Sequence, residues 1–197
     1  MRIVFFGSSD FAIPSLKALK AGGSSPALVV TKPDAPRGRG RKIYDSDVKL
    51  GAQELGLTCL QPSDPHGTEF LDQLRKLKPD LGIVVSYGVI LKPELLALPK
   101  LGMLNAHASL LPLYRGAAPI QRAIRDGRTE TGVTIMRIVE QLDAGDVLLT
   151  KPTPIGPKEN AGALRDRLAE LSGVALLEAL QLLEAGKAKF TPQDPAK

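Results

Sequence analysis

Two hydrogen-bonding side chains stand two residues apart at the start of the stretch NAHASLLPLYRG, residues 105–116. Asn105 and His107 end an apolar run and precede a loop that contains proline. If that run forms a strand, residues two apart point to the same face of the sheet. Both would then donate to the oxygen of a carbonyl group under nucleophilic attack, and one such donor accelerates reaction by about 10² to 10³. The pattern also fits a buried polar pair that only closes the end of a strand.

Asp143 is the candidate third member of this group. It opens the turn-forming sequence Asp-Ala-Gly-Asp at residues 143–146. A carboxylate there would hydrogen-bond His107 and fix the orientation of its ring, or hold a water molecule that moves protons. Aspartate is also an ordinary turn residue, and the distance along the sequence does not by itself bring Asp143 to His107.

Other catalytic chemistries have less support. Cys59 lies in the apolar context of residues 57–60, which is typical of a core thiol. His66 lies in a polar loop without a second candidate ligand beside it, so we expect no metal site. The sequence contains neither a P-loop nor a G-x-S-x-G motif, and residues 7–10 do not match the dinucleotide fingerprint.

Short apolar runs alternate with amphipathic segments along the chain, which predicts an α/β fold with a mainly parallel sheet flanked by helices. Asn105 and His107 end one of the predicted strands, and ligands bind beyond the carboxyl ends of strands in open parallel sheets. The strand end at Ser86-Tyr87-Gly88 is expected nearby. The predicted strands are 2–6, 27–30, 57–60, 81–85, 101–106, 132–139 and 147–149, and the predicted helices are 14–20, 46–55, 68–77, 117–126 and 161–183.

The composition is that of an ordinary globular protein. The chain has 197 residues, of which 43% are hydrophobic and 24% charged, so we expect one compact domain. A single cysteine permits no internal disulfide and fits a reducing compartment. The start has no signal-peptide pattern, and no run approaches the roughly 18 apolar residues of a membrane span. We therefore expect a cytoplasmic protein without membrane contact.

The net charge of +5 is concentrated in one glycine-rich segment, PRGRGRK, which carries Arg37, Arg39, Arg41 and Lys42. Arginines next to glycines fit an arm that binds the phosphates of a nucleic acid. A solvated, flexible loop has the same composition. The predicted irregular segment from about 31 to 45 is long for a connection inside a compact domain, which favours the functional interpretation.

The order and spacing of several motifs together resemble the methionyl-tRNA formyltransferase family, in its N-terminal catalytic domain. The resemblance covers the chain from near its first residue to the Thr-Pro-Gln-Asp sequence at 191–194, which is similar to the family's exit from this domain. The matching stretches are GSSDFAIPSL (7–16), T-x-P-D and G-R-G-x-K (within 31–42), SYGVIL (86–91), NAHASLLPLYRGAAPIQ (105–121), ETGVTIM (130–136) and LDAGDVLL (142–149).

This resemblance implies a Rossmann-like formyltransferase domain. The domain would transfer a formyl group from 10-formyltetrahydrofolate to the amino group of methionyl-initiator tRNA. It implies that Asn105, His107 and Asp143 are the catalytic residues. The implied folate-contacting residues are Ser109, Leu110, Leu111 and Pro112, with the backbone of Tyr87, Gly88, Val89 and Ile90. The implied tRNA contacts are Arg37, Arg39, Arg41 and Lys42, and Phe11 is the candidate for the methionine pocket.

The partners implied are initiator methionyl-tRNA and the folate co-substrate, and a monomer is expected. We expect residues 1–197 to form a single formyltransferase catalytic domain. Family members continue into a C-terminal β-barrel domain that binds tRNA, and we expect that domain to be absent from this chain. The sequence departs from the family pattern at Ser9, Leu113 and Gln141 and in the order of residues around Pro36.

Two other functions fit parts of the pattern. A formyltransferase that acts on a small amine, such as glycinamide ribonucleotide or an amino sugar, would share the N-x-H motif and the distant aspartate. The arginine-rich segment, residues 117–121 and residues 134–136 favour the tRNA enzyme. A non-catalytic folate- or RNA-binding module would not require Asn105, His107 and Asp143.

Overall fold

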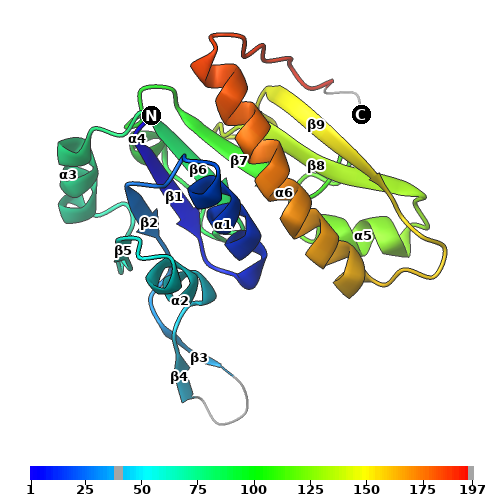
Figure 1. The fold of residues 1–197 in the computed structure, drawn as a ribbon, viewed down its shortest axis with the longest axis horizontal. Coiled ribbons are helices and arrows are strands. Elements are labelled where there is room, and N and C mark those ends of the chain that lie inside the picture. Colours follow the sequence, from blue (N-terminus) through cyan, green and yellow to red (C-terminus); the bar gives the residue numbers. More distant parts are fainter. Residues whose placement is uncertain (38–41, 195–197) are drawn as a thin grey trace. The chain divides into compact units, whose positions relative to one another are not determined.

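A computed structural model describes residues 1–37 and 42–194, and the side chains of residues 36–44 are outside that description. The chain divides into two compact units, Met1–Met103 and Leu104–Lys197. Figure 1 shows the order of the elements along the chain.

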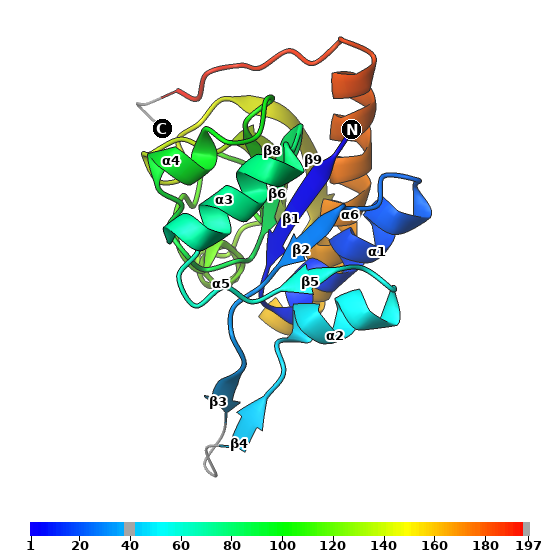
Figure 2. The ribbon, with the colours of Figure 1, turned by 90° about the vertical axis from the view of Figure 1, so that its left-hand side faces the viewer.

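The first unit contains a four-stranded parallel sheet with the order β5-β2-β1-β6. All five residues of β1 and all five of β6 are buried, as expected of strands that are covered on both faces. Figure 2 shows α1 and α2 on one face of this sheet and α3 on the other. The strands are β1 (Ile3–Gly7), β2 (Leu28–Val30), β5 (Cys59–Leu60) and β6 (Leu81–Val85), and the helices are η1 (Asp10–Ala12), α1 (Ile13–Ala21), α2 (Asp47–Glu54), α3 (Thr68–Leu77) and α4 (Pro93–Leu96).

Two short strands interrupt the segment 31–45, which was predicted to be irregular throughout. β3 (Ala35–Arg37) pairs with β4 (Lys42–Tyr44) in an antiparallel ladder, with Ala35 opposite Tyr44. Figure 2 shows this pair extending away from the parallel sheet of the same unit. The prediction was wrong here because a chain that doubles back satisfies its own backbone donors and acceptors, which the Gly, Pro and Arg composition does not indicate.

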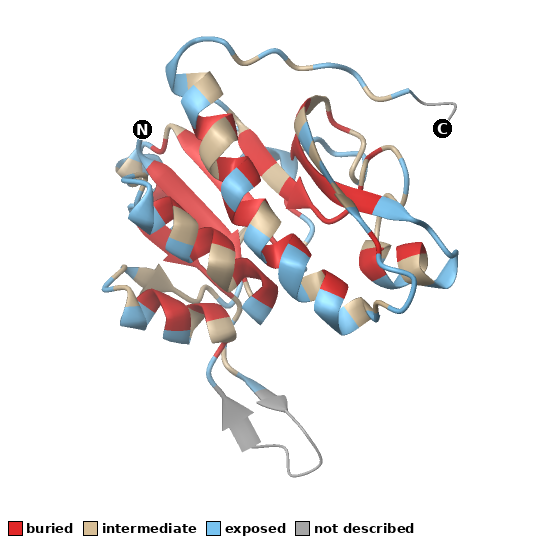
Figure 3. Ribbon diagram, turned by 45° about the vertical axis from the view of Figure 1, so that its right-hand side comes forward, coloured by how far each residue is buried: buried red, intermediate tan, exposed pale blue. Residues whose placement is uncertain are grey.

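The second unit contains three antiparallel strands in the order β7-β8-β9, with α6 packed against β8 and β9. The buried side of α6 includes Leu164, Leu168, Leu176 and Leu180. Figure 3 shows buried and exposed residues alternating along this helix. The strands are β7 (Met103–His107), β8 (Glu130–Arg137) and β9 (Val147–Pro154), and the helices are α5 (Pro119–Arg125) and α6 (Ala161–Glu184).

Most predicted elements are confirmed, and the differences have local causes. α3 and β6 have the predicted bounds. β7 runs to His107 and so contains both members of the Asn105/His107 pair. β9 continues to Pro154 although the prediction ended at Leu149, and its prolines are tolerated because β9 is the last strand in the order. None of the helices that the structure describes is long and apolar enough to cross a membrane.

Candidate active site

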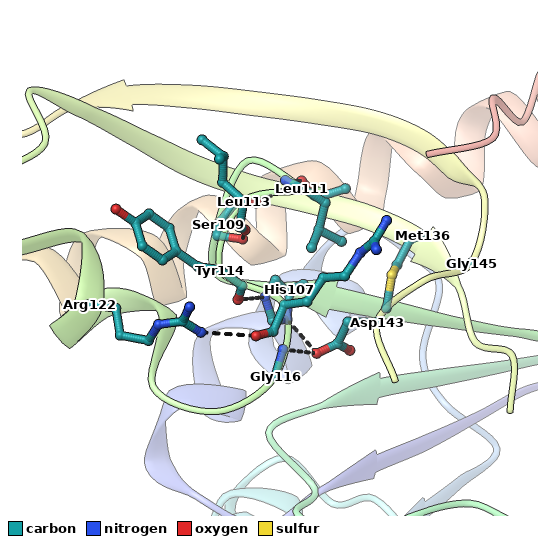
Figure 4. Close-up of polar contacts among 12 residues, drawn as sticks. His107, Ser109, Leu111, Leu113, Tyr114, Gly116, Arg122, Met136, Asp143 and Gly145 are labelled. Atoms are coloured by element: carbon teal, nitrogen blue, oxygen red, sulfur yellow. Dashed lines mark hydrogen bonds and ion pairs between the residues drawn. The ribbon is translucent and has the colours of Figure 1, made fainter. Parts of the chain in front are cut away.

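His107 and Asp143 come together in the second unit (Figure 4). His107 ends β7, and Asp143 lies in the turn between β8 and β9. The distance from His107 Nδ1 to Asp143 Oδ2 is 3.5 Å, and the two side chains are 7% and 13% exposed. The other ring nitrogen, Nε2, donates to the carbonyl oxygen of Tyr114 over 3.0 Å. The structure therefore places the predicted histidine and aspartate side by side, nearly out of solvent.

Both nitrogens of the His107 ring face oxygen atoms that accept hydrogen bonds, a carbonyl and a carboxylate. A neutral imidazole carries one proton and so satisfies one of them, whereas an imidazolium donates to both. Asp143 Oδ2 also accepts the backbone N–H of Gly116 over 2.8 Å. This arrangement suits a histidine that carries positive charge during a reaction, with Asp143 as its counter-ion.

Asn105 lies on β7 two residues before His107. It is opposite Met136 of β8, and His107 is opposite Thr134. Residues two apart on a strand share a face, so the predicted relation between the two side chains holds in the observed register. Asn105 is half-buried.

The loop that follows β7 is held by its own polar groups. Ser109 is fully buried, and its hydroxyl donates to the carbonyl of Leu113 over 2.6 Å. Thr134 Oγ1 donates to the Ser109 carbonyl over 2.7 Å and accepts the N–H of Leu111 over 3.1 Å. Leu110 and Pro112 are half-buried. Two of the four predicted folate-contacting residues of this loop, Ser109 and Leu111, are thus engaged in fixing its path.

Tyr114 is a site residue that sequence reasoning missed. Its carbonyl holds His107, and its backbone has a left-handed φ of 61°. The guanidinium groups of Arg122 and Arg128 lie 5.1 and 5.8 Å from the centre of its ring, within the range of cation–π attraction. Its hydroxyl donates to Asp126 over 3.1 Å and accepts from Arg128 over 2.9 Å. The only sequence signal is the Tyr-Arg-Gly run at residues 114–116, and residue type alone does not indicate that a backbone carbonyl there binds His107.

Two apolar side chains are exposed around this loop. Leu142 is 63% exposed and Leu113 is 41% exposed. A Cβ added to Gly116 would lie 3.5 Å from Leu142, so this leucine is close to the residue that donates to Asp143. Exposed apolar surface of Leu142 therefore lies close to the polar pair of His107 and Asp143.

The remaining predicted ligand residues belong to the first unit. Tyr87 is buried with its ring edge against Phe6, 5.5 Å between centroids, and burial raises the pKa of its hydroxyl to about 12. Gly88 has a φ of 68°, which favours glycine, and the carbonyl of Ile90 accepts a hydrogen bond from His66 over 3.0 Å. Val89 follows Gly88 in this segment. Phe11 is buried in η1, at 7% exposed.

The predicted tRNA-binding residues lie in and around the β3–β4 pair. Arg37 ends β3 and Lys42 begins β4, whereas Arg39 and Arg41 are outside the described residues. Asp34, immediately before β3, ties this pair to its surroundings. Its carboxylate accepts from Lys49 and Gln61 over 2.6 Å each and from the Ser46 N–H over 3.3 Å.

The other candidates from the sequence have ordinary structural roles. Cys59 is a free, half-buried thiol on β5, and burial raises its pKa, which disfavours the reactive thiolate. Within residues 1–37 and 42–194, no group of three His, Cys, Asp or Glu side chains is arranged to hold a metal ion.

Comparison with known proteins identifies relatives for the whole chain. A family model described as "Formyl transferase" matches residues 1–180. The methionyl-tRNA formyltransferase of Moorella thermoacetica is 52% identical over 196 residues, which are 100% of this chain and 63% of that protein. The methionyl-tRNA formyltransferase of Methylococcus capsulatus is 49% identical over 197 residues, which are 64% of its length. The chain thus spans less than two thirds of the length of these relatives.

Solved structures with the same fold have lower identity. The structure of glycinamide ribonucleotide transformylase 1 from Symbiobacterium toebii matches with a TM-score of 0.78 and 21% identity, over 98% of this chain and 94% of that one. An N-formyltransferase from Helicobacter canadensis in complex with folinic acid and dTDP-3-aminofucose matches with a TM-score of 0.73 and 18% identity, over 99% and 68%. The predicted Rossmann-like fold is confirmed.

Proposed function

The chain belongs to the formyl transferase family, and from this premise we propose that it transfers a formyl group from 10-formyltetrahydrofolate to the amino group of methionyl-initiator tRNA. The observation that carries the proposal is the 52% identity, over the full chain, to a methionyl-tRNA formyltransferase. The two solved formyltransferase structures compared above are 21% and 18% identical in sequence to this chain.

The residues of the second unit fit the chemistry of such a transfer. The neutral amine of the acceptor attacks the formyl carbon, and a C–N bond forms while negative charge develops on the formyl oxygen. Asn105 and His107 would donate to this oxygen. The Nε2–H of His107, which donates to the Tyr114 carbonyl in this structure, would turn this donation to the formyl oxygen, while Nδ1 continues to face Asp143.

Asp143 supports the proton movements of the reaction. The attacking nitrogen must lose a proton, and the departing N10 of the folate must gain one when its bond to the formyl carbon breaks. A carboxylate next to the histidine, at 13% exposure, would stabilise the imidazolium and accept and return that proton through water. These steps require no metal ion and no covalent bond to the protein.

The folate co-substrate would lie on the loop after β7. A flat heteroaromatic ring suits exposed apolar surface such as that of Leu142, which is 63% exposed and lies close to Gly116. We propose Ser109, Leu110, Leu111 and Pro112 as contacts, together with the backbone of residues 87–90. Ser109 acts by holding the loop, because its hydroxyl already donates to Leu113.

The tRNA would be bound by the basic β3–β4 segment. Guanidinium groups bind phosphates through paired hydrogen bonds, and Arg37, Arg39, Arg41 and Lys42 carry four positive charges within six residues.

Phe11 remains our candidate for the methionine pocket. Residues 1–197 would act as one catalytic domain, as a monomer in the cytoplasm.

A comparison of acceptors tests the proposal. The purified protein is supplied with 10-formyltetrahydrofolate and with charged initiator tRNA, glycinamide ribonucleotide or an amino sugar nucleotide in turn. We expect formylation of the methionyl-tRNA alone. Turnover of a small amine without turnover of the tRNA would contradict the proposal and favour the small-amine enzyme.

A further inference from the structure

We propose that Gln193 is a positioning residue that holds Asp143 in place for formyl transfer. The inference rests on the proposed function and assigns a task to a residue in the segment after α6. That segment was interpreted from the sequence only as the exit from the domain.

Gln193 makes hydrogen bonds with both atoms of its side-chain amide. Its Nε2 donates to the carbonyl oxygen of Asp143 over 2.9 Å and to that of Gly145 over 2.8 Å. The same nitrogen lies 3.8 Å from the sulfur of Met136. Its Oε1 accepts from Nε of Arg115 over 2.9 Å. One side chain thus connects two segments that are far apart in sequence, the loop after β7 and the turn before β9.

The turn at Asp143 needs such support. Asp143 has a φ of 48°, a left-handed conformation that a residue with a Cβ adopts at an energetic cost. A Cβ added to Gly145 would lie 2.0 Å from the Arg137 carbonyl oxygen, so the chain passes close to β8 at this point. Gln193 holds the carbonyls on both sides of Ala144 and thereby fixes the unfavourable backbone that directs the Asp143 carboxylate.

The contact with Arg115 acts on the other side of the same carboxylate. Arg115 precedes Gly116, whose N–H donates to Asp143 Oδ2 over 2.8 Å. The Arg115 carbonyl also accepts from Arg122 over 3.0 Å, which adds a second anchor to this part of the loop. Gln193 therefore holds the backbone of Asp143 and the segment that donates to its side chain.

Gln193 is itself held by backbone pairing. Thr191 and Val147 exchange two hydrogen bonds of 2.8 Å each, which fasten the segment after α6 to the start of β9. Two residues later, the Gln193 side chain reaches the turn. Its position depends on this pairing, so removal of the side chain should leave the pairing and the fold in place.

Steady-state kinetics of Gln193→Ala and Gln193→Glu test the inference. Gln193→Glu keeps an oxygen for Arg115 but replaces the donor with an atom that repels the two carbonyls. We expect kcat to fall by about 10-fold to 100-fold in both variants, the scale of a misplaced catalytic group, with the KM for tRNA little changed. Gln181→Ala removes an exposed glutamine of α6 and should behave as the parent protein.

Two further measurements separate positioning from general stability. If Gln193 acts through Asp143, adding Gln193→Ala to Asp143→Ala should reduce kcat little beyond the single Asp143 variant. Amide hydrogen exchange at residues 143–145 should be faster in Gln193→Ala, with a thermal midpoint close to that of the parent protein. Full turnover in either Gln193 variant, or losses that multiply in the double variant, would overturn the inference. Absence of formyl transfer in the parent protein would overturn the proposed function instead. The exchange rates at residues 143–145 do not depend on turnover, so they report only on whether Gln193 holds the turn.

Discussion

At the scale of single residues, the second unit places an almost buried histidine between a carboxylate and a backbone carbonyl. Each contact restricts the ring, and each faces one of its two nitrogens. In the proposed reaction the substrate replaces the contact with Tyr114, and Asp143 serves as the counter-ion of the imidazolium. The proposed catalysis depends on charge at Asp143 more than on its shape.

Removing that charge should stop the reaction without preventing folate binding. In Asp143→Asn the side chain keeps an oxygen for the Gly116 N–H but no longer stabilises an imidazolium, and we expect kcat to fall about 10² to 10⁴-fold. His107→Ala should lose at least as much. Turnover is measured with charged tRNA, and binding of a folate analogue by calorimetry. Undiminished turnover in both variants would exclude the mechanism.

The sequence predicted the side chains of this site and not the backbone atoms. Asn105, His107 and Asp143 have residue types that indicate chemistry, and the structure brings His107 and Asp143 together. The Tyr114 carbonyl and the Gly116 N–H are backbone groups. Other residue types carry the same groups, so residue type does not reveal their role. The contact of Gln193 spans 50 positions to Asp143, and a pattern within one element contains no information about it.

At the scale of elements, Asp34 ties the β3–β4 pair to α2. Hydrogen bonds from the Lys49 ammonium and, to a smaller extent, the Gln61 amide lower the pKa of the Asp34 carboxyl to about 2. The hydrogen bond between Lys49 and Asp34 is also the largest cause that raises the pKa of Lys49 to about 12. Lys49 also pairs with Asp45 over 2.6 Å, at the other end of the segment. The ends of the basic segment are therefore held by one small network.

This network predicts a specific pH dependence. Because the pKa of Asp34 is lower in the folded protein than its ordinary value of 3.8, its contribution is present above about pH 4 and is lost as pH falls through 2. The free energy of unfolding should therefore fall more between pH 5 and pH 2 in the parent protein than in Asp34→Asn. Asp72→Asn changes a more exposed carboxylate of α3 and serves as the control. If the free energy of unfolding fell equally between pH 5 and pH 2 in Asp34→Asn and in the parent protein, the anchoring role of Asp34 would be contradicted.

Elements with a strong hydrophobic pattern were predicted well and those with a weak pattern were not. α3 repeats its buried residues Phe70, Leu71 and Leu74 at helical spacing, and β6 is a continuous apolar run, so both have the predicted bounds. β3 and β4 have three residues each, too few for a period to appear. The antiparallel pairing of β7, β8 and β9 depends on contacts between distant segments, which the pattern within each strand does not specify.

At the scale of the whole molecule, the proposed acceptor is a large polyanion and the net charge of the chain is +5. Phosphate contacts contribute affinity that weakens with salt, by a slope of about 0.7 to 0.9 per contact on logarithmic axes. The chain covers 63% of the length of the Moorella thermoacetica relative. Experiments on this chain therefore test the phosphate contacts made by its own 197 residues. The four basic residues of 37–42 are the strongest concentration of positive charge in the sequence.

The number of phosphate contacts made by this segment can be measured from the salt dependence. In Arg39→Ala we expect the KM for tRNA to rise and the slope of log KM against log salt to decrease by about one unit, because one counterion-releasing contact is lost. Lys17→Ala removes the same charge from an exposed position on α1 and should leave both quantities unchanged. The KM for the folate donor should be equal in all three proteins, since its proposed contacts lie elsewhere. An unchanged tRNA KM and slope in Arg39→Ala would assign the glycine-rich segment to a solvated loop without a role in binding.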